Sequence, residues 1–92
     1  MAHLYRTSGK VEEVSPKNGK TFELDELYGL LDCELIEVVT LGRQIMIIDE
    51  EGKYSSKAVN KEATRIAIGN YAIRCDDFIV GDAIVCESNE LD

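Results

Sequence analysis

The fold is decided by the stretch from Leu35 to Lys53, which reads LIEVVTLGRQIMIIDEEGK. Two runs rich in β-branched and apolar residues flank a turn that contains glycine, a pattern typical of a β-hairpin. The second run, Ile45 to Ile48, is apolar at every position. A strand with one wet face would alternate, so this run predicts a strand that is covered on both faces or central in its sheet. We therefore expect Ile45 to Ile48 to form the middle of the core.

Further strands are predicted on either side of this hairpin. Two β-compatible runs around Gly9 indicate an N-terminal hairpin, which ends at the turn formed by Pro16 and Asn18–Gly19. The last strand is expected to run from Phe78 to Cys86. Gly81–Asp82 in its middle indicates a bulge or a close approach of another backbone.

Two helices are predicted between the strands. The first should be capped by Thr21, and Gly29 within it indicates close packing on the sheet. Its apolar residues recur at helical spacing: Leu24, Leu27, Tyr28 and Leu31. The second helix can begin at Ser56 or at Asn60, and we favour Asn60 as its N-cap and Gly69–Asn70 as its stop. Three of its residues should then face the sheet: Ala63, Ile66 and Ala67.

Together these elements predict an α+β fold with the order ββαββαβ, in which a mixed or antiparallel sheet of about five strands carries two helices. A chain of 92 residues has room for one modest core, so we expect residues 1–92 to form a single domain. The acidic tail, residues 87–92, is expected to fray. The N-terminus lacks the apolar region of a signal peptide, and no segment is long enough to span a membrane, so the expected location is the cytoplasm.

The charge of the chain restricts its partners. Eighteen acidic residues stand against 10 basic ones, which gives a net charge of −8. This balance argues against direct nucleic-acid binding through phosphate contacts and against binding to an anionic membrane surface. It is explained either by solubility alone or by a surface that meets a basic partner. The sequence leaves the oligomeric state open.

The cysteines indicate free thiols rather than a disulfide framework or a metal site. There are three of them, Cys33, Cys75 and Cys86, and no two are spaced as Cys-x-x-Cys. Free thiols in a reducing compartment are the expected state. One histidine and three scattered cysteines are too few for a zinc site, and no metal or other cofactor is predicted.

Three groups of polar residues are candidate sites. The turn Asp49–Glu51 could collect a hard cation, although its spacing fits a solvated hairpin end with Gly52 at positive φ better. The acids near the last strand, Asp76, Asp77 and Asp82, could act as a carboxylate pair if Asp77 approaches Asp49, but a helix-cap or bulge role for Asp82 is the simpler interpretation.

The third candidate is an anion site at the start of the second helix. A helix N-terminus offers free N–H groups and a positive dipole. The side chains expected to bind the anion there are Lys57, Asn60, Lys61 and Arg65. The simpler alternative is a capped surface helix whose charges are only solvated. No residue is predicted to be catalytic.

Several short motifs follow one another along nearly the whole chain: Leu4–Thr7, Pro16 with Asn18–Lys20, Phe22–Leu24 with Glu26–Leu27, Ile36–Val39, Asp49–Lys53, Asn60 with Ala63–Thr64, and Asp77–Asp82. In the order and spacing of these motifs the chain resembles the domain-of-unknown-function family 3846 of small bacterial, phage and mobile-element proteins. The chain departs from the family pattern at Asp49, where an Asn is common, and at Ala58–Val59, where Leu-Pro is common, which leaves the start of the second helix open. The resemblance implies a source and a fold class rather than an activity.

Two functional hypotheses follow. The first is a non-enzymatic interaction protein of a phage or mobile element that binds a host or element-encoded protein with a basic surface. A narrower form is an anti-defence protein that imitates DNA through rows of carboxylates. The alternative is a binder of a small anionic ligand such as a nucleotide, or an enzyme acting on one, at the start of the second helix.

Overall fold

The central hairpin is present as predicted in the computed structural model, which describes residues 2–91. Strand β3 (Ile36–Leu41) pairs antiparallel with β4 (Gln44–Asp49), from Ile36 opposite Asp49 to Leu41 opposite Gln44. Gly42, at φ 86°, begins the two-residue turn between them, where a positive φ matches the twist of the two strands. The register is unbroken along the whole hairpin, which keeps the apolar run of β4 in a fixed orientation.

Five antiparallel strands form one sheet in the order β2-β1-β5-β4-β3. The N-terminal hairpin consists of β1 (Ala2–Tyr5) and β2 (Val11–Val14). The last strand, β5 (Ala83–Glu87), lies between β1 and β4 and joins the two hairpins. With α1 (Leu24–Leu31) and α2 (Lys61–Gly69) this gives the order ββαββαβ, so the predicted α+β fold is confirmed.

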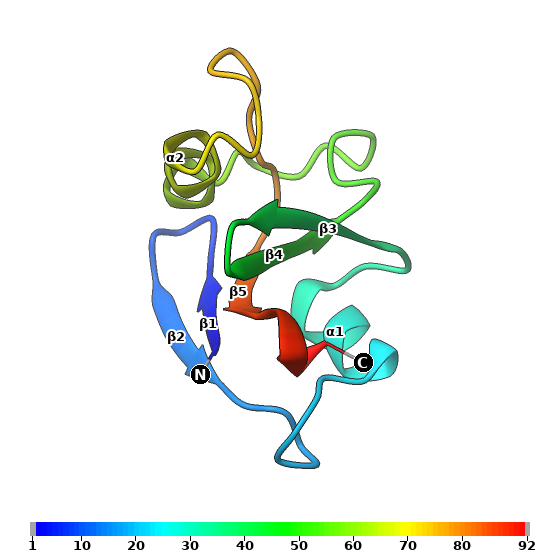
Figure 1. Cartoon of the computed structure of the whole chain (residues 1–92). Helices are drawn as coiled ribbons and strands as arrows, with labels where there is room; N and C mark the ends of the chain where they lie inside the picture. Colours follow the sequence, from blue (N-terminus) through cyan, green and yellow to red (C-terminus); the bar gives the residue numbers. More distant parts are fainter. Residues whose placement is uncertain (1, 92) are drawn as a thin grey trace.

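The two helices lie on opposite sides of the sheet, as Figure 1 shows. Ile45 and Ile47 of β4 belong to the apolar cluster under α1, which also contains Phe22, Leu27 and Leu31. Met46 and Ile48 belong to the cluster under α2, with Ala63 and Ala67. All four residues of the run are at most 8% exposed. The expectation that this strand is covered on both faces is therefore confirmed.

The predicted helix starts have different outcomes. Asn60 caps α2, since its side chain accepts a hydrogen bond from the Ala63 N–H. The N-cap of α1 is Glu23 rather than Thr21, because Glu23 and Glu26 form a capping box in which each side chain accepts from the other's backbone N–H. Leu24, the first residue of α1, is 52% exposed, so its place in the buried stripe was predicted wrongly.

At three glycines the structure differs from what the sequence predicted. Gly81 has φ 78°, and β5 begins only at Ala83, so the predicted strand from Phe78 starts five residues too early. Gly52 was expected at positive φ, but its φ is not positive. A Cβ at this position would lie 2.8 Å from Val80 Cγ2, so glycine is required there because Val80 approaches closely. A Cβ at Gly29 would meet nothing within 4 Å, so Gly29 does not mark packing on the sheet.

The end of the chain continues past β5 in a short helix. Glu87 ends β5, the 3-10 helix η1 (Ser88–Glu90) follows, and Leu91 forms a bridge with Phe22. Asp92, the last residue of the predicted tail, lies outside the described residues. Over residues 2–91, no helix has the length and apolar character needed to cross a membrane.

Candidate functional site

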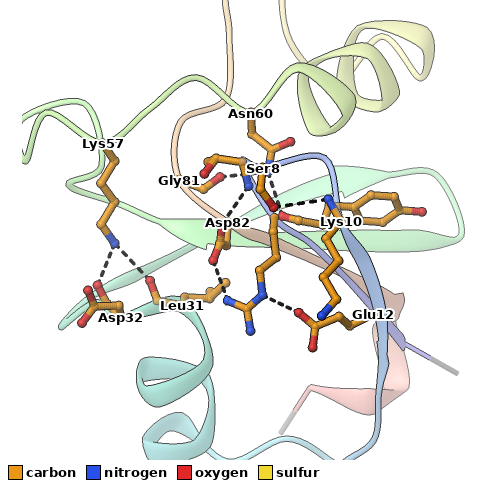
Figure 2. A network of polar contacts seen from close by, with 12 residues as sticks. Ser8, Lys10, Glu12, Leu31, Asp32, Lys57, Asn60, Gly81 and Asp82 are labelled. Carbon is orange, nitrogen blue, oxygen red and sulfur yellow. Dashed lines mark hydrogen bonds and ion pairs between the residues drawn. The ribbon is translucent and has the colours of Figure 1, made fainter.

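Asn60, one of the four residues of the predicted anion site, is buried, and its side-chain amide makes three hydrogen bonds within the protein. Its side chain is 1% exposed, and its Nδ2 donates to the Tyr5 carbonyl at 2.8 Å and to the Gly81 carbonyl at 2.9 Å. Its Oδ1 accepts from the Ala63 N–H at 3.0 Å. The residue therefore ties the start of α2 to β1 and to the segment before β5 (Figure 2).

Lys57 points away from α2 and toward the C-terminal end of α1. Its Nζ lies 2.9 Å from Asp49 Oδ2 and donates to the carbonyls of Leu31 and Asp32 at 3.0 and 2.6 Å. Figure 2 shows this ammonium beside Leu31 and Asp32. A cation at the C-terminal end of a helix interacts favourably with the helix dipole. Lys57 thus joins the end of β4 and the end of α1 to the segment that leads into α2.

Lys61 and Arg65 lie on the exposed side of α2. Arg65 donates to Glu62 of the same helix, and this hydrogen bond raises the pKa of the Arg65 guanidinium. Three of the four predicted residues, Asn60, Lys57 and Arg65, thus bond to other groups of the protein. Each of the three bonds to a different part of the fold. The anion site stays a prediction, and no contact of the described residues favours it.

Asp77 and Asp49 line the same pocket, but each pairs with a different lysine. Asp77 Oδ1 lies 2.7 Å from Lys53 Nζ and also accepts from the Phe78 N–H. These bonds, that of Lys53 first, lower the pKa of the Asp77 carboxyl. Asp49 is 6% exposed and pairs with Lys57 instead. The two carboxylates therefore act as anchors for different lysines rather than as an acid–base pair.

Asp82 has neither a helix-cap nor a bulge role. Its carboxylate accepts from Arg6 Nη1 and from the Thr7 N–H, both at 2.9 Å. Arg6 also pairs with Glu12, which lowers the pKa of the Glu12 carboxyl and raises that of the Arg6 guanidinium. Asp82 thus holds the first hairpin to the start of β5 across the network in Figure 2.

A hollow with four acids among its eight lining residues lies where α1 and β4 end. It measures about 650 Å³ and is lined by Tyr28, Asp32, Cys33, Glu34, Asp49, Glu51, Ser55 and Lys57. Three of its four carboxylates, those of Asp32, Glu34 and Glu51, are on exposed residues. Its one cation, Lys57, already pairs with the fourth, Asp49. The hollow therefore offers unneutralised negative charge to the solvent, and we name it the acidic hollow.

Cys33 lies in the acidic hollow without the features of a nucleophile. Its thiol is half-buried, and burial, assisted by the charge of Asp49, raises its pKa. A reactive cysteine needs a lowered pKa, because the thiolate is the attacking species. Among residues 2–91, no three His, Cys, Asp or Glu side chains are placed to hold a metal ion. The chemistry that this hollow offers is the attraction of positive charge.

A smaller pocket of about 140 Å³ lies beside β3 on the α2 side of the sheet; Asp49 lines both this pocket and the acidic hollow. Val39, Ile48 and Ile79 supply buried apolar walls, and Glu37 and Glu50 supply exposed carboxylates. Phe78 also lines it and is 41% exposed. We name it the β3 pocket.

The sequence did not predict the acidic hollow or the β3 pocket. Their residues are spread from Tyr28 to Lys57 and from Glu37 to Val80. The one available signal was the density of acids between Asp32 and Glu51. In the sequence these acids indicate only a hairpin end and an overall negative charge.

Comparison with known proteins identifies a family without an activity. The family described as "Domain of unknown function (DUF3846)" matches residues 2–92. Neither the curated proteins nor the solved structures give a match. Function therefore has to be argued from the geometry above.

Proposed function

The chain belongs to the DUF3846 family, and we propose that it is a non-enzymatic interaction module that binds a partner protein carrying a basic surface. The observation that carries the proposal is the acidic hollow, whose exposed carboxylates of Asp32, Glu34 and Glu51 face solvent beside a lysine that is already paired. A Lys or Arg of the partner would find several acceptors there together with the ring of Tyr28.

The distribution of the remaining charge supports this proposal. Within residues 2–91, five of the 10 basic residues pair with the chain's own carboxylates: Arg6, Lys53, Lys57, Arg65 and Arg74. These cations already have a carboxylate as partner, whereas Asp32, Glu34 and Glu51 of the hollow have no basic partner among the ion pairs within residues 2–91. A net charge of −8 adds long-range attraction, which raises the rate at which a basic partner is encountered.

We further propose that the partner is encoded by the host or by the phage or mobile element, and that the two meet in the cytoplasm. The family resemblance supports the source, and three free thiols are compatible with a reducing compartment. In the narrower form of the proposal the module imitates DNA. Competition between the protein and duplex DNA for a DNA-binding host protein tests that form, and simultaneous binding of both would exclude it for that protein.

The test of the proposal is an affinity capture from host lysate, repeated at low and high salt. Attraction between exposed charges is screened within about 8–10 Å at 0.1–0.15 M salt, so capture should fall as salt rises. The double variant Glu34→Gln/Glu51→Gln removes two charges from the acidic hollow. Its matched control, Glu13→Gln/Asp25→Asn, removes two exposed charges elsewhere.

The hollow variant should lose the partner while the control retains it. Equal losses in both variants would mean that only net charge matters. A partner whose capture ignores both salt and the hollow variant would refute the proposal.

A further inference from the structure

The outer edge of β3 has main-chain groups available for another strand. Within the described sheet β3 is an end strand and pairs only with β4. The Glu50 N–H donates to the Leu35 carbonyl, so the alternation of an antiparallel pair directs the even-numbered residues of β3 outward. The N–H and C=O groups of Ile36, Val38 and Thr40 therefore point away from β4. These six groups form the edge to which an extended chain can add.

This edge lacks the features that usually prevent strand addition. It is six residues long, has an unbroken register, and contains no Lys, Arg or Pro. The opposite edge, β2, has only four residues, two of which are glutamates, and Pro16 follows it closely. Short, charged edges next to proline resist pairing with other chains, whereas long, β-branched edges accept it. The chain thus protects one edge of its sheet and leaves the other available.

The two faces next to the β3 edge favour different side chains. On the α2 side, the β3 pocket combines apolar walls with the carboxylates of Glu37 and Glu50. On the α1 side, Val38 is 43% exposed. Side chains of an added strand alternate between these faces. A segment with basic residues at every second position and apolar residues between them would match both.

The chain's own Lys53 lines this pocket together with Asp77, and it shows how a basic side chain is bound there. Its Nζ lies 4.5 Å from the centroid of the Phe78 ring and 2.7 Å from Asp77 Oδ1. A cation over an aromatic face beside a carboxylate is favourable on both counts. A pocket of about 140 Å³ has room for the aliphatic stem of a second basic side chain, whose charged end would reach Glu37 or Glu50.

We infer that an extended segment of a partner, with alternating basic and apolar residues, adds to the sheet along β3 and places a Lys or Arg in the β3 pocket. The inference rests on the proposed function and gives it a geometry. A second copy of this chain is a poor occupant, because each copy carries a net charge of −8 and would bring Glu37 to the shared edge.

The experiment is an NMR titration of the ¹⁵N-labelled protein with a synthetic peptide of alternating valine and lysine. Amide shifts should centre on Ile36, Val38 and Thr40. Two further peptides carry N-methyl groups on either the valine or the lysine amides, so that only one of them loses the donors facing β3. That peptide should bind about tenfold more weakly or worse than its isomer, the loss expected for a missing hydrogen bond or two.

Protein variants test the same edge from the other side. Val38→Pro removes an outward N–H and leaves the ladder to β4 intact, a placement that edge strands tolerate. It should abolish the shifts while circular dichroism stays unchanged. Glu37→Gln should weaken binding more than the matched change Glu13→Gln on the opposite edge. If Val38→Pro unfolds the domain, the methylated peptides still decide the question.

The outcomes separate the inference from the proposed function. Equal binding of the two N-methyl peptides, or no binding of the parent peptide, would overturn strand addition. The capture experiment on the acidic hollow would be unaffected by either result. A peptide with glutamate in place of lysine should not bind. If it binds as well as the lysine peptide, the placement of a Lys or Arg in the β3 pocket is wrong, whereas the capture experiment still tests the acidic hollow.

Discussion

The two faces of the sheet are packed in different ways. Under α1, large apolar side chains fill the space, among them Phe22, Leu27 and Leu31. Under α2, the buried helix residues are alanines, Ala63 and Ala67, which belong to one buried cluster with Ala83 of β5. Small side chains bury little apolar area each, so the α2 face has less hydrophobic stabilisation per residue of helix.

The α2 face has buried and partly buried hydrogen bonds in addition. Asn60 makes three of them at the start of α2, and the Thr64 hydroxyl donates to the Asn60 carbonyl and accepts from the Ile79 N–H. Buried polar groups of this kind fix a position strongly but are costly when one partner is removed. The difference teaches that α1 is stabilised by the packing of large apolar side chains and α2 by hydrogen bonds. Substitutions can test each of these two statements.

The largest effect is expected on the α1 face. Leu27→Ala removes a fully buried side chain and should lower the free energy of unfolding by about 2–5 kcal/mol, measured by chemical denaturation. The matched control is Leu24→Ala in the same helix, where the side chain is 52% exposed and the change should stay within about 0.5 kcal/mol. Similar losses of unfolding free energy in Leu27→Ala and Leu24→Ala would contradict the statement that buried apolar side chains stabilise α1.

The next effect belongs to the α2 face. Asn60→Ala removes the helix cap and leaves the carbonyls of Tyr5 and Gly81 without their donor, which should cost about 2–4 kcal/mol. Asn70→Ala is the matched control, because this asparagine bonds only at the exposed end of the same helix. Its cost should be below about 1 kcal/mol. If the two variants unfold at the same denaturant concentration, the hydrogen bonds of Asn60 are not what holds α2.

A third substitution tests whether the α2 face needs small residues. Ala67→Leu adds volume at a position that is fully buried between α2 and the sheet. Overpacking of this kind should lower stability by about 1–3 kcal/mol. If Ala67→Leu leaves the thermal stability unchanged or raises it, there is unfilled volume under α2. The statement that this face needs small residues would then be wrong.

A stabilising change is expected on the outer side of α1. Gly29 is exposed, and a Cβ there would meet nothing within 4 Å. Gly29→Ala should therefore raise stability by about 0.5–1 kcal/mol through helix propensity alone. Gly52→Ala is the contrasting variant, since its Cβ would lie 2.8 Å from Val80 Cγ2, and it should destabilise. Loss of stability in Gly29→Ala would mean that the outer side of α1 also contributes packing.

The smallest effect is expected on the loss of folding stability at low pH. The folded state lowers the pKa of Glu12, through Arg6, and of Asp77, through Lys53. A lowered pKa contributes stability above the ordinary values of 4.5 for Glu and 3.8 for Asp, and this is lost as pH falls through the lowered values. Unfolding free energies between pH 6 and pH 2 should therefore decline less steeply for Glu12→Gln and Asp77→Asn than for the wild type. Parallel curves would contradict this linkage.

Local pattern was enough to predict the elements of this fold. The apolar run Ile45–Ile48 predicted a strand covered on both faces, and Asn60 was identified as a cap from its position before an amphipathic segment. Both signals depend on periodicity and on neighbours within a few residues, which the sequence displays directly. Errors arose where two local signals competed: Glu23 rather than Thr21 caps α1, and Gly81 ends the segment before β5.

The candidate site was decided by contacts between distant residues. By itself the sequence determined the order ββαββαβ, the acidic charge and the cap at Asn60. Only the tertiary structure decided that Lys57 pairs with Asp49 and the end of α1, and that β3 is an end strand. These results depend on strand order and on which helix covers which face. Local propensity does not specify such choices, because they follow from how all the apolar faces are buried together.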